Sequence, residues 1–417
     1  MREMKDTQNN CLGMIPKDWE YPRLKYYCKI SNGSDPQTEG QIPVYGSGKE
    51  IVKYCGEYKE GPAILLGRKG TLDKPRYIEG KFWNVDTAMD AYPINGINSK
   101  FLYFVATILD IGRYATVTAK PSMTQSDYYN MPIPVPPASE QEQIVRYIEE
   151  KTADIDEAIS RQKEAIEKLE EYRVNTFTFA TTKGLSGNVQ LKDTGLNWIP
   201  KIPEKWDVIK ITHLVDQDHP YAIGDGDHGI IKNSMYQEKG IPYIRVQNLE
   251  WGTDMNLDNV VYISEELNDM IKNSTLRPND VLFAKTGATI GKTAIVPESL
   301  PISNTTSHVG KLTIANKYNP KYIFYVLSSK TGYDQFWQYA SMKATRPELS
   351  IEDIKQLIIP IPLNRHEQDE IVSFLDQISA NVEIAKKTHQ DIIEKLEEYK
   401  KSLIYNAVTG KIDCRNA

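Results

Sequence analysis

The chain has 417 residues, enough for two or three domains, and its 40% hydrophobic and 25% charged residues are ordinary for a globular protein. A formal net charge of −6 argues against a protein that coats nucleic acid indiscriminately, although local basic surfaces decide specific binding. The four cysteines have no metal-ligand spacing, the first residues lack an apolar signal-peptide core, and the longest apolar run, 101–109, is too short to cross a bilayer. We therefore expect a cytoplasmic protein that contacts no membrane.

Repetition of the same short motifs dominates the sequence. The motif Glu-Gln-x-x-Ile-Val begins at residue 140 and again at 367, and Lys-Leu-Glu-Glu-Tyr begins at 168 and again at 395, so both are offset by 227 (367 − 140 and 395 − 168). Lys-Asp-Thr begins at 5 and 192, and Ile-Pro begins at 15 and 202, which is an offset of 187 (192 − 5 and 202 − 15). The chain is therefore predicted to be two units, each with an opening motif, a globular segment and a long helix.

The first globular segment is expected to be rich in strands, because short apolar runs end in turns that contain Gly or Asp. The expected strands are 42–45, 63–66 and 82–88. A helix is expected over 101–109, and a proline-rich stretch then leads to the long helix. The start of that helix carries a capping box formed by Ser139 and Glu142.

The second globular segment follows the same plan with insertions. The corresponding parts, in chain order, are a strand at 240–245, a strand and basic loop at 281–287, a helix at 322–327 and a turn at 346–350. Similar long helices beside dissimilar globular segments suggest a shared frame that carries two different recognition heads.

Each repeat ends in a long helix with a heptad pattern. Apolar positions recur at alternating steps of three and four, which places a narrow apolar stripe on one face and requires a partner helix to cover it. Gln162 in one copy and His389 in the other interrupt the stripe, and we interpret them as a register device. An ordinary surface helix packed on its own domain is the alternative, but two matching stripes favour pairing. The residues predicted to pair the helices are Ile155, Ala158, Ala165, Leu169, Tyr172, Val382, Ala385, Ile392, Leu396 and Tyr399.

These patterns set the expected domain boundaries. The expected segments are a first globular domain with its opening motif at 1–137, a central long helix at 138–182, a linker at 183–198, a second globular domain at 199–365, a C-terminal long helix at 366–410 and a tail at 411–417. The fold class that follows is α+β, with two mixed α/β domains, two long helices and an internal two-fold repeat.

Two motifs that could indicate other chemistry fail on their spacing. The loop 287–293, Gly-Ala-Thr-Ile-Gly-Lys-Thr, has three residues between its glycines, whereas a phosphate-cradling loop needs four. The polar stretch 216–228 contains aspartates and histidines, but it matches neither a calcium loop nor a zinc spacing. No catalytic nucleophile arrangement is evident. We therefore expect a non-catalytic chain that carries no metal and no cofactor of its own.

Basic, amide and aromatic residues occur on equivalent turns of both globular segments. Arg, Gln and Asn can bond base edges in pairs, whereas Lys more often anchors phosphates. Any one of these residues taken alone is at least as often a solvated surface side chain, so the signal is their recurrence. The candidate DNA contacts are Tyr45, Ser47, Lys49, Arg68, Lys69, Lys74, Arg76, Lys120, Arg245, Gln247, Asn248, Lys285, Thr286, Lys292, Lys343 and Arg346.

Several of these motifs occur together in one known family. They are the stretch 192–206, Lys-Asp-Thr-Gly-Leu-Asn-Trp-Ile-Pro-Lys-Ile-Pro-Glu-Lys-Trp, the proline-rich lead to Glu-Gln-x-x-Ile-Val, and Lys-Leu-Glu-Glu-Tyr. Over essentially its whole length the chain resembles the DNA-specificity (S) subunits of type I restriction–modification systems. The stretches 42–48 and 66–70 also resemble a recurring version of the family's target-recognition domain. One departure is the first opening motif, which lacks the tryptophan present at Trp198.

The resemblance implies two target-recognition domains separated by two long helices that pack as an antiparallel coiled coil. It implies a subunit that reads a bipartite, asymmetric site in double-stranded DNA and assembles with two methyltransferase (M) subunits and, for cleavage, with restriction (R) subunits. S-adenosylmethionine, ATP and Mg²⁺ are then expected only on the partner subunits. Two other functions stay open: an ATP-binding enzyme built on the loop 287–293, and a protein-binding coiled-coil scaffold without base-specific DNA recognition.

Overall fold

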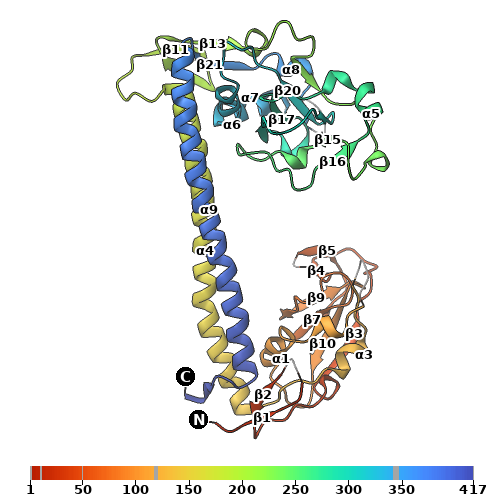
Figure 1. Ribbon diagram of the computed structural model, residues 1–417. Helices are drawn as coiled ribbons and strands as arrows, with labels where there is room; N and C mark the ends of the chain where they lie inside the picture. Colours follow the sequence, from red (N-terminus) through yellow and green to blue (C-terminus); the bar gives the residue numbers. More distant parts are fainter. Residues whose placement is uncertain (1, 10–11, 49, 117–120, 341–346, 417) are drawn as a thin grey trace. The chain divides into compact units, whose positions relative to one another are not determined.

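Two units make up the computed structural model of this chain, and Figure 1 shows the elements of each. Unit 1 comprises Met1–Lys163 and Gln390–Ala417, and unit 2 comprises Glu164–His389. The structure describes residues 2–9, 12–48, 50–116, 121–340 and 347–416. Because both long helices cross the boundary between the units, each unit holds one part of each helix.

In the described part of unit 1, two four-stranded sheets and a hairpin carry the β-structure. One sheet has the order β3 (Cys28–Asn32), β10 (Ala88–Pro93), β7 (Ala63–Gly67) and β8 (Arg76–Ile78). The other has the order β5 (Ile51–Cys55), β4 (Ile42–Tyr45), β9 (Lys81–Asn84) and β6 (Lys59–Glu60). The hairpin joins β1 (Met4–Asp6) to β2 (Met14–Pro16). The short helices are α1 (Ser99–Ala106), α2 (Ile111–Tyr114) and α3 (Gln125–Asn130), with 3-10 turns at Leu24–Tyr26 and Cys414–Asn416.

The core of unit 1 lies around strand β7 and helix α1. All five residues of β7 are buried, because the strand runs between β10 and β8 and has an unbroken apolar sequence. Asn98 caps α1 by accepting hydrogen bonds from two backbone N–H groups, which sets the buried Phe101 against this sheet. The buried Tyr128 of α3 donates a hydrogen bond to the carbonyl of Gly67 (2.7 Å), so α3 is fixed to the end of β7.

Unit 2 has the same kinds of sheet with more connecting segments. Its four-stranded sheet has the order β14 (Ile223–Asp225), β20 (Val309–Leu312), β17 (Val281–Ala284) and β18 (Thr293–Ile295). Its three-stranded sheet has the order β16 (Val261–Ile263), β15 (Ile241–Ile244) and β19 (Asn304–Thr305). Two pairs complete the strands, β11 (Leu191–Leu196) with β12 (Ile199–Pro203), and β13 (Trp206–Lys210) with β21 (Ile358–Pro362). The short helices are α5 (Glu265–Met270), α6 (Pro320–Ser328), α7 (Lys330–Ala340) and α8 (Ile351–Ile354), with 3-10 turns at Ile211–His213, Asn233–Met235, Val246–Asn248, Lys272–Ser274 and Gly287–Thr289.

The internal repeat extends to strand pairing. The order β3-β10-β7-β8 in unit 1 corresponds to β14-β20-β17-β18 in unit 2. The parallel pair β4 with β9 corresponds to the parallel pair β15 with β19. In the two opening hairpins Lys5 pairs with Ile15 and Lys192 pairs with Ile202, which keeps the 187-residue offset read from the sequence (192 − 5). Both units are therefore built on one plan, and the mixed α+β class is confirmed.

In unit 1 the repeated Glu-Gln motif anchors the start of the long helix α4 (Ala138–Lys183). The buried Gln141 accepts a hydrogen bond from the N–H of Asn98 (2.8 Å) and donates to the carbonyl of a proline just before the helix (3.0 Å). Glu140 accepts a hydrogen bond from the indole N–H of the buried Trp19 (3.0 Å). Because Asn98 is the cap of α1, this motif fixes the long helix to the globular part of its own unit.

In unit 2 the second copy of the motif makes the same contacts at the start of the long helix α9 (Arg365–Val408). Gln368 accepts from the N–H of Asn319 (2.8 Å), the cap of α6, and donates to a proline carbonyl (2.9 Å). The indole N–H of Trp206 donates to Glu367 (2.8 Å). The repeated motif is thus a structural anchor in both units.

Three side chains that we predicted to pair the helices are exposed, namely Tyr172 (52%), Ile392 (37%) and Tyr399 (59%), so the prediction is wrong for them. The residues directly after two of them, Arg173 and Ile393, are buried. Ile392 and Ile393 stand at the third and fourth positions after His389, so both suit the apolar pattern, and the later one is buried. Of the other predicted positions, Ile155 and Val382 are buried and Ala158, Ala165, Leu169, Ala385 and Leu396 are partly buried.

Two element boundaries also differ from the expectation. The predicted strand 82–88 is divided, because β9 ends at Asn84 and β10 begins at Ala88, with a turn between them. The predicted linker 183–198 contains β11, whose backbone pairs with β12 and is therefore structured from Leu191 onward. In both cases backbone pairing, which is set by the neighbouring strand, decided the boundary.

Candidate nucleic-acid interface

In unit 1 three loops bring predicted DNA contacts together at the end of β7. Lys69 lies 3.1 Å from the carboxylate of Asp86, and Arg68 donates to the backbone carbonyl of Asp86 (3.1 Å). Ser47 donates its hydroxyl to the carbonyl of Lys69 (2.8 Å), and its own N–H donates to the hydroxyl of Thr87 (3.4 Å). The loops after β4, after β7 and between β9 and β10 therefore form one polar surface, which we name the unit 1 loop cluster (residues 45–48, 68–70 and 86–87).

Arg76 extends this cluster. Its guanidinium lies 4.6 Å from the ring centroid of Tyr45 and donates to the carbonyl of Gly48 (2.7 Å), which fixes both the ring and the loop. Lys74 is exposed on the preceding loop. Four further predicted contacts, Lys49, Lys120, Lys343 and Arg346, lie outside the described residues.

The cations of the unit 1 loop cluster are available to a ligand. The side chains of Arg68 and Lys69 are 32% and 49% exposed, and their shared carboxylate, Asp86, is 49% exposed. An exposed ion pair of this kind contributes only about 0–1 kcal/mol, so a DNA phosphate can replace the carboxylate at small cost. Asp86 itself accepts hydrogen bonds and is suited to the exposed amino group of a cytosine.

A backbone frame positions these loops. Arg68 donates its N–H to the carbonyl of Thr87 (2.8 Å) and accepts at its own carbonyl from the N–H of Met123 (2.9 Å). Gly70 donates its N–H to the carbonyl of Pro121 (3.0 Å) and has a φ of +82°, a conformation that side chains other than glycine rarely adopt.

Unit 2 repeats this frame bond for bond. Lys285 donates its N–H to the carbonyl of His308 (2.9 Å) and accepts from the N–H of Leu349 (2.9 Å). Gly287, with a φ of +65°, donates to the carbonyl of Pro347 (2.9 Å). Arg68 therefore corresponds to Lys285, and the loops of the second head occupy the same positions in the fold.

Two of the predicted contacts in unit 2 are corrected by their burial. Lys285 is 4% exposed and forms an ion pair with the buried Asp225, so its ammonium is used inside the unit. Asn248 is 1% exposed, and its amide accepts from the N–H of Arg245 (2.9 Å) and donates to the carbonyl of Asn256 (2.9 Å). We remove both residues from the candidate DNA contacts, because neither has a free polar atom at the surface.

The remaining predicted contacts of unit 2 are more varied. Arg245 is partly buried, lies 5.4 Å from the ring of Tyr236 and donates to a backbone carbonyl (3.0 Å), whereas Gln247 is exposed. Thr286 is buried, and its hydroxyl lies 3.3 Å from Nδ1 of the exposed His308. We name the exposed part of this surface, Gln247 with the loop 306–308, the unit 2 loop cluster.

Lys292 belongs to the loop 287–293, on which the alternative nucleotide site was based. Its ammonium donates to the carbonyl of Leu249 (3.1 Å) and lies 3.6 Å from the carboxylate of Glu250. The glycine-containing segment before it, Gly287–Thr289, is a single 3-10 turn rather than a wide loop of free N–H groups. These contacts use the lysine within the unit and give no support to a nucleotide site.

Asp86 and Thr87 of the unit 1 loop cluster and His308 of the unit 2 loop cluster were not among the predicted contacts. Asp86 and Thr87 were placed inside a predicted strand, and His308 follows a strand too short to recognise. The signal that could have found them is the repeat itself, because the residues between β9 and β10 and those between β19 and β20 precede equivalent strands.

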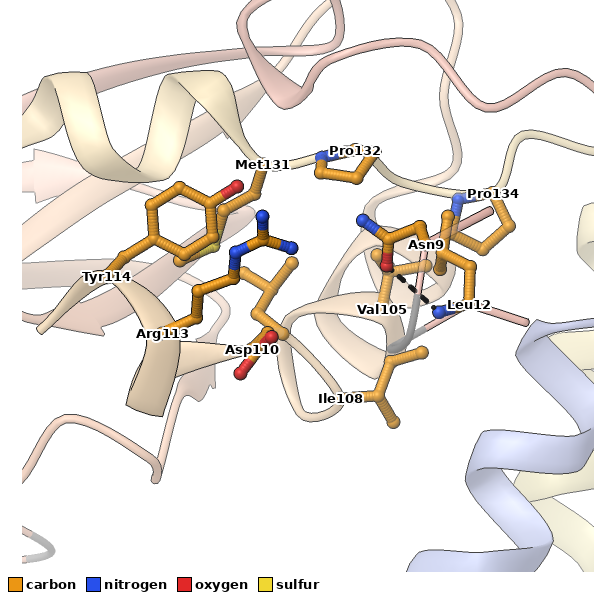
Figure 2. A pocket seen from close by; sticks show the side chains of 11 residues that line it. Asn9, Leu12, Val105, Ile108, Asp110, Arg113, Tyr114, Met131, Pro132 and Pro134 are labelled. Atoms are coloured by element: carbon orange, nitrogen blue, oxygen red, sulfur yellow. Dashed lines mark hydrogen bonds between the residues drawn. The ribbon is translucent and has the colours of Figure 1, made fainter. Parts of the chain in front are cut away.

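A small pocket in unit 1 adds little chemistry (Figure 2). Its lining is mostly apolar, and the hydrogen bond within it joins the side chain of Asn9 to the N–H of Leu12 (3.2 Å). Arg113 contributes an exposed cation to its wall. Among the described residues, no group of three or more His, Cys, Asp and Glu side chains is placed to hold a metal ion. None of the helices formed by these residues has the length and apolarity needed to cross a bilayer.

Comparison with known proteins gives this geometry a family. This chain matches the family described as type I restriction modification DNA specificity domain. The match covers residues 16–168 and 203–395. The chain is 24% identical to the type I restriction enzyme EcoBI specificity subunit of Escherichia coli, covering 88% of this chain and 78% of the relative. It is 23% identical to the MjaVIII specificity subunit of Methanocaldococcus jannaschii, covering 96% of this chain and 95% of the relative.

A solved structure has the same fold. A chain from work on the complex assembly and conformational transition of the type I R-M system aligns with a TM-score of 0.61 at 17% identity, covering 95% of this chain and 99% of that chain. The chain therefore belongs to the type I restriction–modification DNA-specificity family. Its role is to recognise DNA sequence for an enzyme complex, and it is not itself the enzyme.

Proposed function

We propose that this chain reads a bipartite, asymmetric site in double-stranded DNA, with one head on each half-site. The observation that supports this most is the backbone frame common to both heads, on which the exposed side chains differ. Arg68, Lys69 and Asp86 stand on the frame of unit 1, whereas Gln247 and His308 flank that of unit 2. Equivalent frames would meet the duplex in equivalent ways, and unlike side chains would select unlike bases.

The long helices pair, in this proposal, as an antiparallel coiled coil that spaces the heads. In unit 2 Arg173 of α4 donates to Glu383 of α9 (2.9 Å), and in unit 1 Lys400 of α9 donates to Asp156 of α4 (2.6 Å). Each residue of one pair is 227 positions from its counterpart in the other (400 − 173 and 383 − 156), a relation that a two-fold antiparallel pair would produce. A helix of 46 residues rises roughly 70 Å at ~1.5 Å per residue, about two turns of B-DNA.

The partners follow from the family. We infer that the paired helices dock two methyltransferase subunits, and restriction subunits in the full complex. S-adenosylmethionine, ATP and Mg²⁺ would be held by those partners, and this chain would carry no cofactor. A base stacked inside the duplex cannot enter an active site, so the enzyme that methylates it must first flip it out. Both base flipping and methyl transfer would therefore belong to the methyltransferase subunits. The net charge of −6 fits a subunit whose DNA affinity depends partly on partners that close around the duplex.

A protein-binding scaffold without base-specific recognition is the second candidate. The paired helices alone would suit it, but it gives no reason for cations and hydrogen-bonding groups to gather on the shared loop frame. The DNA-reading function accounts for both features.

Methylome sequencing tests the proposal. Cells that express this chain with its neighbouring methyltransferase are compared with cells from which this gene alone is deleted. We expect a motif of two unlike half-sites that disappears on deletion. An unchanged methylome in cells with an active methyltransferase would contradict DNA reading and favour the scaffold.

A head exchange sharpens the test. Replacing residues 13–137 with the corresponding segment of another specificity subunit should change one half-site and leave the other half-site and the spacer as they were. The unexchanged chain is the control, and a change in both half-sites would contradict the assignment of one head to each half.

A further inference from the structure

Unit 2 contains a pocket of about 580 Å³ that the loop clusters do not include. Its walls are one turn of α4, the end of α6, the start of α7 and the loop residues Trp251 and Gly291. A volume in the range ~300–1,000 Å³ with a mainly apolar lining and a few polar groups is typical of a ligand site. The polar groups present decide which ligand it would take.

Two aromatic rings give the pocket an electron-rich side. Trp251 and Tyr333 are 45% and 43% exposed, and their ring centroids are 6.4 Å apart at an interplanar angle of 53°. Gly291 has a φ of +101°, and a Cβ there would lie 2.9 Å from Tyr333 and 3.1 Å from Trp251, so a glycine is needed where the rings approach. Exposed faces of Trp and Tyr attract cations.

The ionic residues around the pocket are paired, with one exception. Within unit 2 the pairs are Arg173 with Glu170 and Glu383, Lys386 with Glu170 and Glu383, and Lys330 with Asp334. Among the described lining residues, Glu171 is the charged side chain without an ion pair. It is exposed, so its carboxylate is open to a ligand. Glu171 is therefore the charged group of the lining that can meet a ligand without giving up an ion pair, which favours a cation.

One donor in the pocket wall also lacks a partner. Arg173 is 1% exposed, its two terminal nitrogens bond Glu383 and the carbonyl of Trp251, and its buried Nε–H has no hydrogen-bond partner. A buried donor left without an acceptor costs free energy, so a ligand that brings an acceptor oxygen would be favoured. The pocket wall thus offers an open carboxylate to a cation and, beneath its surface, a donor that lacks an acceptor.

We propose that this pocket binds an arginine residue of a partner polypeptide. The guanidinium would lie against the rings of Trp251 and Tyr333 and pair with Glu171, while the arginine's aliphatic stem would cover the apolar lining. A shift of the pocket wall on binding would let a carbonyl oxygen of the same peptide accept from the buried Nε–H of Arg173. A peptide supplies both groups within one residue, which a simple organic cation does not. The proposal is independent of the DNA-reading function, since none of these residues belongs to a loop cluster.

Fluorine NMR of the full chain tests it directly. The six tryptophans are replaced by 5-fluorotryptophan, and the signal of Trp251 is assigned with the variant Trp251→Phe. The probe is the blocked tripeptide acetyl-Gly-Arg-Gly-amide, and its control contains citrulline, a neutral isostere of arginine. We expect a saturable shift of the Trp251 signal with the arginine peptide and a far smaller response to citrulline. Equal responses, or no response of Trp251, would overturn the proposal.

Matched variants locate the cation. Glu171→Gln should weaken binding of the arginine peptide by roughly three- to tenfold, because it removes the unpaired carboxylate. Its counterpart one repeat later, Glu398→Gln (171 + 227), is exposed on α9 outside the pocket and should leave binding unchanged. Unchanged binding by Glu171→Gln would overturn the cation site. Methylguanidinium that binds as tightly as the peptide would overturn the assignment to a polypeptide.

Discussion

Arg68 and Lys285 occupy equivalent positions in the two heads, but their side chains have different surroundings. Each follows the central buried strand of its sheet and makes the same backbone hydrogen bonds. Arg68 extends to a partly exposed carboxylate, whereas Lys285 is enclosed with Asp225. A basic residue at a recurring loop position is therefore exposed as a candidate DNA contact in one head and enclosed in an internal ion pair in the other.

Substitution of Arg68 should affect DNA binding and leave stability unchanged. We expect Arg68→Ala to reduce the slope of log affinity against log salt by about 1, as loss of one phosphate contact does. Its melting temperature should stay close to that of the parent chain, since the lost ion pair is weak. Anisotropy titrations of the assembled complex at several salt concentrations, with a thermal melt of each sample, measure both quantities. An unchanged salt slope would remove Arg68 from the interface.

Substitution of Lys285 should have the opposite effect. Lys285→Ala leaves the buried Asp225 without its lysine, and breaking a buried ion pair costs about 3–5 kcal/mol of folding free energy. Denaturant unfolding measures this loss, and the double variant Lys285→Ala with Asp225→Asn should recover part of it. A loss below about 1 kcal/mol would show that the pair is not as enclosed as its burial indicates.

The thiol of Cys28 offers a pH-dependent test of burial. Burial raises its pKa to about 12, because the thiolate is not solvated in the core. At pH 8 the folded chain therefore holds almost no Cys28 thiolate, and iodoacetamide should alkylate this residue only after unfolding. Mass spectrometry of digests from native and denatured samples gives the comparison. Alkylation of Cys28 at equal rates in both samples would contradict a buried thiol.

At the scale of elements, each long helix is anchored to a head at its start and carries a buried stripe along its length. Their starts are fixed to the heads by the Glu-Gln motif, where Gln141 and Gln368 make equivalent pairs of hydrogen bonds. Their inward stripe runs through positions such as Ile155 and Ile393 rather than through the tyrosines of the repeated Lys-Leu-Glu-Glu-Tyr motif. Tyr172 and Tyr399 are thereby left on the outside of the helices, in the region proposed to dock partners.

Two neighbouring isoleucines of α9 test the position of the stripe. Ile393 is 4% exposed and Ile392 is 37% exposed, so they match in chemistry and differ in burial. Ile393→Ala should cost about 2–5 kcal/mol of folding free energy, whereas Ile392→Ala should cost well under half of that. Denaturant unfolding of both variants provides the measurement. Equal losses of folding free energy in the two variants would show that Ile392 belongs to the buried stripe, as the heptad pattern predicted.

At the scale of the whole molecule, a common frame with separate loop clusters would make the two proposed half-sites independent. The bonds from Gly70 to Pro121 and from Gly287 to Pro347 hold equivalent loops in place. Each loop cluster lies within one unit, and its side chains contact residues of that unit. A change in one cluster should therefore leave the other cluster intact.

Single substitutions in the two clusters should separate the half-sites. We expect Asp86→Ala to relax the sequence preference in one half of the methylated motif and His308→Ala to relax it in the other. Each lost base contact should cost about 1–3 kcal/mol of discrimination. Methylome sequencing of both variants gives the result, with Glu398→Gln as a control outside the clusters. Relaxation of the same half by both variants would contradict the one-head, one-half-site assignment.

The sequence by itself determined the repeat, the mixed α+β class, the long helices and the loops that carry basic residues. These follow from constant offsets and hydrophobic periodicity, which are local properties of the chain. Periodicity could not separate Ile392 from Ile393, because both suit a helical stripe. Only the tertiary structure decided that Lys285 is internal, since its partner Asp225 lies 60 residues earlier in the chain. It likewise brought Asp86 beside Lys69, because pairing of distant strands, which no local pattern encodes, sets which loops meet.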